Sequence, residues 1–238
     1  MRTLPDNACE NGHGKRNRHF DSLGATLSVQ DRAAHTHGRR AAGYARLLGR
    51  HIGLSSERLL VLTQAVTLHD LGKMHIPTRI LTKSEPLTHP EWQVMKSHVV
   101  IGYAMLSALP GFEAAADIVL AHHERFDGGG YPHRLEGDEI PLGARICVLA
   151  DCLDALTAVN QPYRRPLMFS EACRHIVSKS GTCFDPDLVD VLLSLRYSGR
   201  PSDLELEEDA TLDLKATKAL RSGDTSHFDK AEGVMVAC

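Results

Sequence analysis

The sequence has few aromatic residues, no long apolar run and no strand-like alternation of polar and apolar residues. Aromatic residues make up only 5% of the 238 positions. No stretch approaches the run of about 18 apolar residues that crosses a membrane. The first twenty residues also lack the apolar core of a secretory signal peptide. We therefore expect a cytoplasmic protein that makes no use of a membrane.

The six cysteines do not form a CxxC pair, and a chain of this length does not need disulfide bonds to stabilise its core. We expect reduced thiols, most of them buried, in a reducing compartment, with the terminal one exposed. They are Cys9, Cys147, Cys152, Cys173, Cys183 and Cys238.

The chain also lacks an excess of charge of either sign. Its formal net charge of -3 argues against a nucleic-acid-binding surface over the whole molecule. Hydrophobic residues make up 42%, which is typical of a globular protein with a full core. The sequence therefore predicts one domain with at most a short appendage, and no nucleic-acid polymer as partner.

Apolar residues recur at helical spacing through most of the chain, so the expected fold is all-α: a helical bundle with long loops and at most a small hairpin. Helices are expected to end near Gly53, to begin at Ser55 or Ser56, and to run from Thr88 to the "LPG" at 109–111. Further helices are expected from about Glu113, at about 140–159, from a cap at Ser170, and from a cap at Asp185 with Pro186 following it.

Composition divides the chain into three parts. Residues 1–22 are polar and are expected to form a flexible tail, and residues 23–197 the helical domain. Residues 198–238 are first acidic and then small and polar, and we expect an appendage there that is partly helical or disordered.

Histidine is abundant, with 14 residues, and two of them are adjacent in "HHERFDGGGYP" at 122–132. Adjacent side chains on a helix point about 100° apart, so His122 and His123 do not share one small pocket easily. They can both reach one metal ion, or two neighbouring ones, where a helix ends. Two half-exposed histidines at a helix C-terminus remain the alternative for this pair alone.

The segment "HDLGK" at 69–73 is the second unusual stretch. The two oxygens of the Asp70 carboxylate can bridge two cations, whereas the His69 imidazole offers one nitrogen to one cation. Lys73 places a positive charge close by. The alternative is a surface His–Asp pair at a helix end, which is common for the dipeptide but not for the longer segment.

Three further residues extend this pattern. His37 and Arg40 lie on one helical face. His98 lies on the apolar side of a helix, where a lone histidine is more often a satisfied core residue. Asp151 lies in a strongly apolar helix, where aspartate is rare unless it is paired or binds a metal.

Together, these residues would satisfy two divalent ions, iron or manganese first and zinc as a third option, rather than calcium. Two such ions would activate a bridging hydroxide for attack on phosphorus, and Lys73 would neutralise charge on the phosphate. The expected ligands are His37, His69, Asp70, His98, His122, His123 and Asp151.

The segments "HDLGKMHIP", "HHERFDGGGYP", "IPLGARICVLADCLDALT" and "PYRR" resemble the HD-GYP family, a branch of the HD phosphohydrolases, from about residue 25 to 195. The resemblance implies an all-helical cyclic di-GMP phosphodiesterase with two non-haem iron or manganese ions. It implies a first metal held by His37, His69, Asp70 and Asp151. It also implies that Asp70 bridges to a second metal held by His98, His122 and His123.

The resemblance also implies that Lys73 contacts the scissile phosphate. It further implies that the loop of Gly130, Tyr131 and Pro132 touches the substrate or a partner, such as a diguanylate cyclase.

Three departures from the family pattern qualify this expectation. Ala33 stands where many members have a glutamate associated with a third metal, so two metals are expected; nearby His35 points differently on a helix. Gln161 replaces an arginine that grips phosphate, and Arg164 or Arg165 is expected to compensate. The chain has too few residues before 25 for a sensor domain, so we expect a stand-alone catalytic domain or one that takes its signal from a separate protein.

The first hypothesis for function is hydrolysis of cyclic di-GMP to the linear dinucleotide pGpG, with or without further hydrolysis to GMP. Two alternatives stay open. One is hydrolysis of another cyclic dinucleotide or nucleotide, because of Gln161. The other is a weakly active module that binds a cyclic dinucleotide or a diguanylate cyclase.

Overall fold

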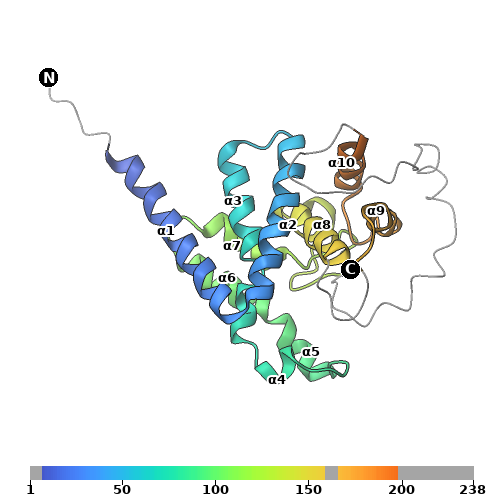
Figure 1. The fold of residues 1–238 in the computed structure, drawn as a ribbon, viewed down its shortest axis with the longest axis horizontal. Coiled ribbons are helices and arrows are strands. Elements are labelled where there is room, and N and C mark those ends of the chain that lie inside the picture. Colours follow the sequence, from blue (N-terminus) through green and yellow to red (C-terminus); the bar gives the residue numbers. More distant parts are fainter. Residues whose placement is uncertain (1–6, 159–165, 198–238) are drawn as a thin grey trace.

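The computed structural model describes residues 7–158 and 166–197 (Figure 1). Within these ranges the regular elements are helices, and the β-structure consists of two isolated bridges. The prediction of an all-α fold is therefore confirmed. The elements are α1 (Asn7–Gln30), α2 (Arg32–His51), α3 (Ser56–Thr67), η1 (Leu71–His75), α4 (Thr78–Leu81), α5 (His89–Lys96), α6 (His98–Ser107), α7 (Glu113–Ala121), η2 (Gly137–Glu139), α8 (Leu142–Thr157), α9 (Phe169–Ser178) and α10 (Pro186–Tyr197), where η marks a 3₁₀ helix.

Polar side chains begin several helices as the sequence predicts. The Ser55 side chain accepts a hydrogen bond from the backbone at the start of α3. Thr88 and Glu91 form the predicted capping box of α5, in which each side chain accepts from a backbone N–H of the other. Pro186 is the first residue of α10, which suits its missing N–H.

Three local predictions were wrong. Residues 7–22 belong to α1 rather than to a flexible tail, because this helix is anchored at its far end, where Leu27 is buried. The helix expected from Thr88 to residue 108 is interrupted at Ser97, whose hydroxyl donates to the Val94 carbonyl. The N-cap of α9 is Met168, not Ser170.

The core forms where α2 packs against α3 on one side and α8 on the other, with α7 behind α3 (Figure 1). Small residues allow these helices to approach closely. A Cβ atom at Gly38 of α2 would collide with the backbone of Thr67 in α3, and one at Gly72 would collide with the His98 carbonyl. These close approaches bring the ends of α3 and α6, and the middle of α2, to one place.

Two further findings bear on the sequence predictions. Among the described helices, none combines the length and the apolar character needed to span a membrane. Gln161, Arg164, Arg165 and the segment 198–238 lie outside the described residues.

Candidate metal centre

All seven predicted ligands meet in one centre, and most of them stand at helix ends. His69 and Asp70 follow α3, His98 begins α6, and His122 and His123 follow α7. Two longer helices supply the rest: His37 comes from α2 and Asp151 from α8. Helix ends suit this task, because the chain turns there and adjacent side chains can both face one point.

Three of the histidines are oriented in the same way by their own helices. The Nδ1 atom of His69 lies 2.8 Å from the Val66 carbonyl, that of His98 lies 2.8 Å from Met95, and that of His122 lies 2.7 Å from Val119. A carbonyl only accepts, so Nδ1 carries the proton in each ring. The lone pair is then on Nε2, which is free to bind a metal.

Several polar atoms in this centre are buried and have no hydrogen-bond partner among residues 7–158 and 166–197. They are Oδ1 of Asp70, Nε2 of His98, Nε2 of His122 and Nδ1 of His123. Burying such atoms without a partner costs about 1–3 kcal/mol each. All four are electron-pair donors, and a divalent metal ion would satisfy them together, so the residues present fit the metals that the sequence pattern implies.

The donor atoms fall into two groups, and Asp70 connects them. One group is His37, His69 and Asp70, and the other is His98, His122 and His123; within each group the donor atoms lie within 4.8 Å of one another. Oδ2 of Asp70 lies 3.4 Å from Nε2 of His69, and Oδ1 lies 3.6 Å from Nε2 of His98. The carboxylate therefore has one oxygen directed to each group.

Asp151 belongs to the first group through His37. Its Oδ1 atom lies 2.7 Å from Nε2 of His37 and 3.8 Å from Nε2 of His69. Burial would raise the pKa of Asp151, but the hydrogen bond from His37 and the favourable charge interactions with His69 and His37 together outweigh burial and lower this pKa to about 2. The carboxylate is therefore ionised and available as a ligand at neutral pH.

The second group consists of neutral imidazoles. Burial lowers the pKa of His122 to about 3 and lowers the pKa of His123 and His98 as well. His37 behaves in the opposite way. Burial alone would lower its pKa, but hydrogen bonds to Asp151 and Asp154 outweigh burial and raise it to about 10. A metal ion must therefore displace a tightly held proton from His37.

Asp154 is a functional residue that the sequence reasoning missed. Its side chain is buried and accepts from three donors: Nδ1 of His37 at 2.6 Å, and Nε and Nη2 of Arg40, both at 2.8 Å. The signal was present, because a second aspartate three residues after Asp151 lies on the same face of an apolar helix. Asp154 orients the His37 ring and so aims Nε2 at the centre.

Lys73 and Tyr131, predicted to touch substrate, both lie beside the centre. Nζ of Lys73 lies 2.7 Å from Oδ2 of Asp70. The Tyr131 ring stacks on the His123 ring, with the two centroids 4.9 Å apart. Nζ of Lys96 also lies over the Tyr131 ring, 5.6 Å from its centroid. The site therefore has a cation and an aromatic ring at its edge.

Buried Glu124, directly after the histidine pair, holds the loop that carries Tyr131. Its two oxygens accept from the backbone N–H groups of His133 at 2.7 Å and Leu135 at 3.1 Å. A Cβ atom at Gly130 would collide with the backbone of Arg125, so glycine is needed where the loop folds back. This explains why a glycine-rich segment follows the two histidines.

Helical folds with clustered histidines and aspartates of this kind define a class of metal-dependent proteins. Residues 22–188 match the family described as HD domain, and the chain belongs to this family. The resemblance seen in the sequence is borne out by this family match and by relatives named cyclic di-GMP phosphodiesterases.

A cyclic di-GMP phosphodiesterase of Thermotoga maritima is 38% identical over 178 residues, which cover 74% of this chain and 48% of that protein. The cyclic di-GMP phosphodiesterase response regulator RpfG of Xanthomonas campestris pv. campestris is 40% identical over 172 residues, or 71% of this chain and 43% of that protein. The chain thus spans about half the length of these curated relatives.

A solved structure shows the same fold. The crystal structure of a cyclic GMP-AMP specific phosphodiesterase of V. cholerae, V-cGAP3, superimposes with a TM-score of 0.62 at 22% identity, and covers 85% of this chain and 52% of that one. At this identity the likeness concerns the fold alone.

Proposed function

We propose that this protein is a metal-dependent phosphodiesterase that hydrolyses cyclic di-GMP to the linear dinucleotide pGpG, and onward to GMP. The observation that carries the proposal is the position of Asp70, which directs one carboxylate oxygen to each group of histidines. Two relatives, 38% identical over 178 residues and 40% identical over 172 residues, are named cyclic di-GMP phosphodiesterases. We infer the activity of the whole protein from the position of Asp70 together with the names of these relatives.

His37, His69, Asp70 and Asp151 would hold one metal ion, and His98, His122 and His123, with Asp70, the second. When bound, the two ions supply Lewis acidity and lower the pKa of coordinated water. Iron or manganese suits a set of imidazoles and carboxylates without thiolate.

The Lys73 ammonium interacts with the negative charge of the substrate phosphate. Burial would lower the pKa of Lys73, but the neighbouring Asp70 carboxylate outweighs burial and raises it, so the ammonium stays charged. Its side chain is 23% exposed, whereas that of Asp70 is 9% exposed. Lys73 therefore reaches outward from the centre and stabilises negative charge on the attacked phosphate.

The Tyr131 loop forms one wall of the substrate site. Stacking on His123 fixes the ring beside the second group of histidines. A nucleobase can stack on an aromatic side chain of this kind. Arg164, outside the described residues, is proposed as a further phosphate contact, and the loop as the contact for a diguanylate cyclase or a separate sensor protein.

The test is turnover of cyclic di-GMP by protein purified without oxygen and loaded with Fe(II) or Mn(II). We expect pGpG, then GMP, by chromatography, with two metal ions per chain by elemental analysis. Asp70→Ala should lose both metals and all product, because it removes the ligand shared by the two groups. Retention of two ions in this variant would contradict the bridging role.

Two other outcomes would replace the proposal. Turnover of cyclic GMP-AMP but not of cyclic di-GMP would assign a different cyclic dinucleotide. Tight binding of cyclic di-GMP without any product, despite two bound metals, would instead favour a binding module.

A further inference from the structure

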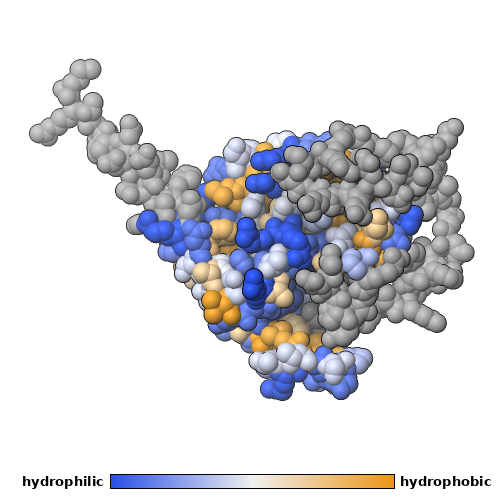
Figure 2. Space-filling model, viewed as in Figure 1, coloured by the Kyte–Doolittle hydropathy of each residue, from blue (hydrophilic) through white to orange (hydrophobic). Residues whose placement is uncertain are grey.

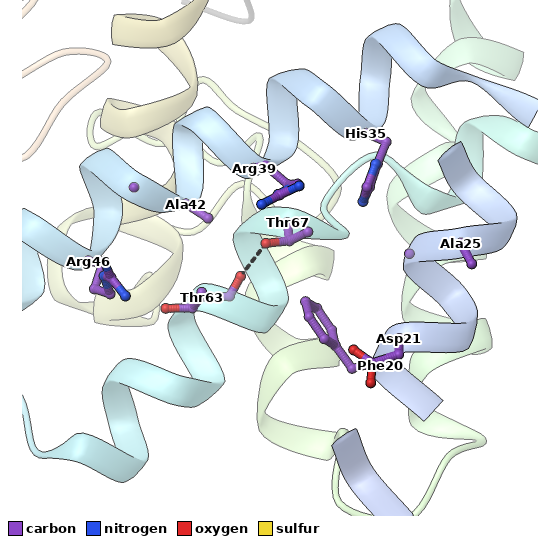
Figure 3. A pocket seen from close by; sticks show the side chains of 11 residues that line it. Phe20, Asp21, Ala25, His35, Arg39, Ala42, Arg46, Thr63 and Thr67 are labelled. Atoms are coloured by element: carbon purple, nitrogen blue, oxygen red, sulfur yellow. Dashed lines mark hydrogen bonds between the residues drawn. The ribbon is translucent and has the colours of Figure 1, made fainter. Parts of the chain in front are cut away.

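A second cavity lies between α1, α2 and α3, on the side of α2 away from the metal centre. Its volume is about 540 Å³, within the range of about 300–1,000 Å³ that is typical of small-molecule sites. Figure 3 shows His35 and Arg39 extending from α2, and Phe20 from α1, into the same space beside Thr67. Hydrophilic residues dominate the surface over α2 (Figure 2).

Two guanidinium groups line this cavity without an ion-pair partner among the residues that the structure describes. Arg39 and Arg46 lie seven residues apart on one face of α2, or about 10 Å along the helix axis. Within the described part of the chain, neither forms an ion pair with a carboxylate. The next residue, Arg40, instead faces Asp154 and the metal centre. Arg39 and Arg46 are thus placed to hold an anion, and arginine is well suited to phosphate.

The rest of the lining suits a nucleobase and a sugar. Phe20 offers a half-buried ring on which a base can stack. Asp21 adds one carboxylate, which attracts a group with two adjacent N–H donors, such as the Watson–Crick edge of guanine. The hydroxyls of Thr63 and Thr67 already donate to backbone carbonyls, so their oxygens remain as acceptors for ribose hydroxyls.

We propose that this cavity binds a guanine mononucleotide, with its phosphate on Arg39 and Arg46, its base against Phe20, and its N–H edge on Asp21. Adenine presents a ring nitrogen acceptor at the corresponding place, which the Asp21 carboxylate would repel. The site is separate from the metal centre and does not depend on the proposed hydrolysis.

The cavity can be filled without disturbing the fold. A Cβ atom at Gly43, on the cavity wall, would meet nothing within 4 Å. Gly43→Leu should therefore occupy the space with a side chain, and leucine is a better helix former than glycine. Circular dichroism can verify that this variant is folded. Loss of nucleotide binding in the folded variant would then result from the filled cavity.

The test is isothermal titration of the full-length protein with GMP, AMP and inorganic phosphate. We expect one GMP per chain at this cavity, and at least tenfold weaker binding of AMP and of phosphate. Arg39→Ala and Arg46→Ala should each weaken GMP binding about tenfold or more, because each removes a charged hydrogen bond. Gly43→Leu should abolish binding, and Asp21→Asn should reduce the preference for GMP over AMP.

Lys73→Ala is the matched control, because it alters the metal centre and leaves the cavity intact. GMP binding at this cavity should be unchanged in it. The proposal is overturned if GMP does not bind, if Lys73→Ala abolishes binding while Gly43→Leu does not, or if phosphate binds as tightly as GMP.

Discussion

Replacing Asp154 by asparagine is expected to weaken metal binding, although Asp154 itself is not a predicted ligand. The carboxylate accepts from His37 and from two nitrogens of Arg40 at 2.6–2.8 Å. Asparagine keeps the shape, but it loses the charge and replaces one acceptor oxygen by an NH₂ donor. The His37 ring then loses its charged partner, and one oxygen is left for the donors of His37 and Arg40.

The size of the effect follows from these contacts. A hydrogen bond to a charged group contributes about 1.5–3 kcal/mol. The Arg40 side chain is 46% exposed, so solvent screens its pairing, and the His37 contact dominates. We expect the free energy of unfolding to fall by about 2–4 kcal/mol, and metal affinity to fall about 10- to 100-fold, as is typical for a group that orients a metal ligand.

The assay is competition for Mn(II) with a chelator of known affinity, together with urea unfolding of the metal-free protein. Arg40→Ala separates the contributions, because it removes the arginine and leaves the contact between Asp154 and His37. Asp117→Asn, on the exposed side of α7, is the control and should change neither quantity. Metal affinity within about twofold of wild type in Asp154→Asn, despite lower stability, would refute the orienting role.

Three further predictions concern the same centre. Lys73→Ala should keep both metals while the rate of hydrolysis falls at least tenfold; loss of metal in this variant would show that Lys73 is not a phosphate contact. Gly72→Ala should destabilise the protein by about 3 kcal/mol or more, because the new Cβ would collide with the His98 carbonyl, whereas Gly43→Ala, which meets nothing, should be neutral or stabilising in thermal unfolding. Stability of the metal-free protein should fall as pH is lowered from 6.5 towards 3, because the folded pKa of His122 is about 3 and the unfolded histidine takes up a proton first. The free energy of unfolding should fall by about 1.4 kcal/mol per pH unit in this range. His37, with its folded pKa raised to about 10, should add stability that is fully present below pH 6.5 and is lost as pH rises towards 10. Urea unfolding across this range would contradict both assignments if stability were independent of pH.

The candidate ligands of the centre could be picked out from sequence, because they come in local segments with distinctive residue types. Adjacent histidines and an adjacent His–Asp pair are costly to bury without a metal, and each stands where an apolar helix ends. Helix caps at Ser55 and Thr88 were also predictable, since a cap involves residues two or three positions apart.

The errors share a different cause. The polar residues before Leu23 gave no sign of a helix, because α1 is held by packing of its far end against α2 rather than by its own composition. The role of Asp154 depends on a contact with His37, 117 positions away in the chain. Ser97 interrupts a periodic segment whose apolar pattern continues on both sides.

The sequence by itself determined the helical class, most helix boundaries and the choice of seven candidate donor residues, because these follow from local propensity and from the cost of burying polar groups. Only the tertiary structure decided which donors share a group, that Asp70 faces both groups, and that α1 encloses a basic cavity with α2 and α3. Those properties depend on how closely helices approach at glycines such as Gly38 and Gly72, and the distance between two helices is a property of their packing, not of either segment alone.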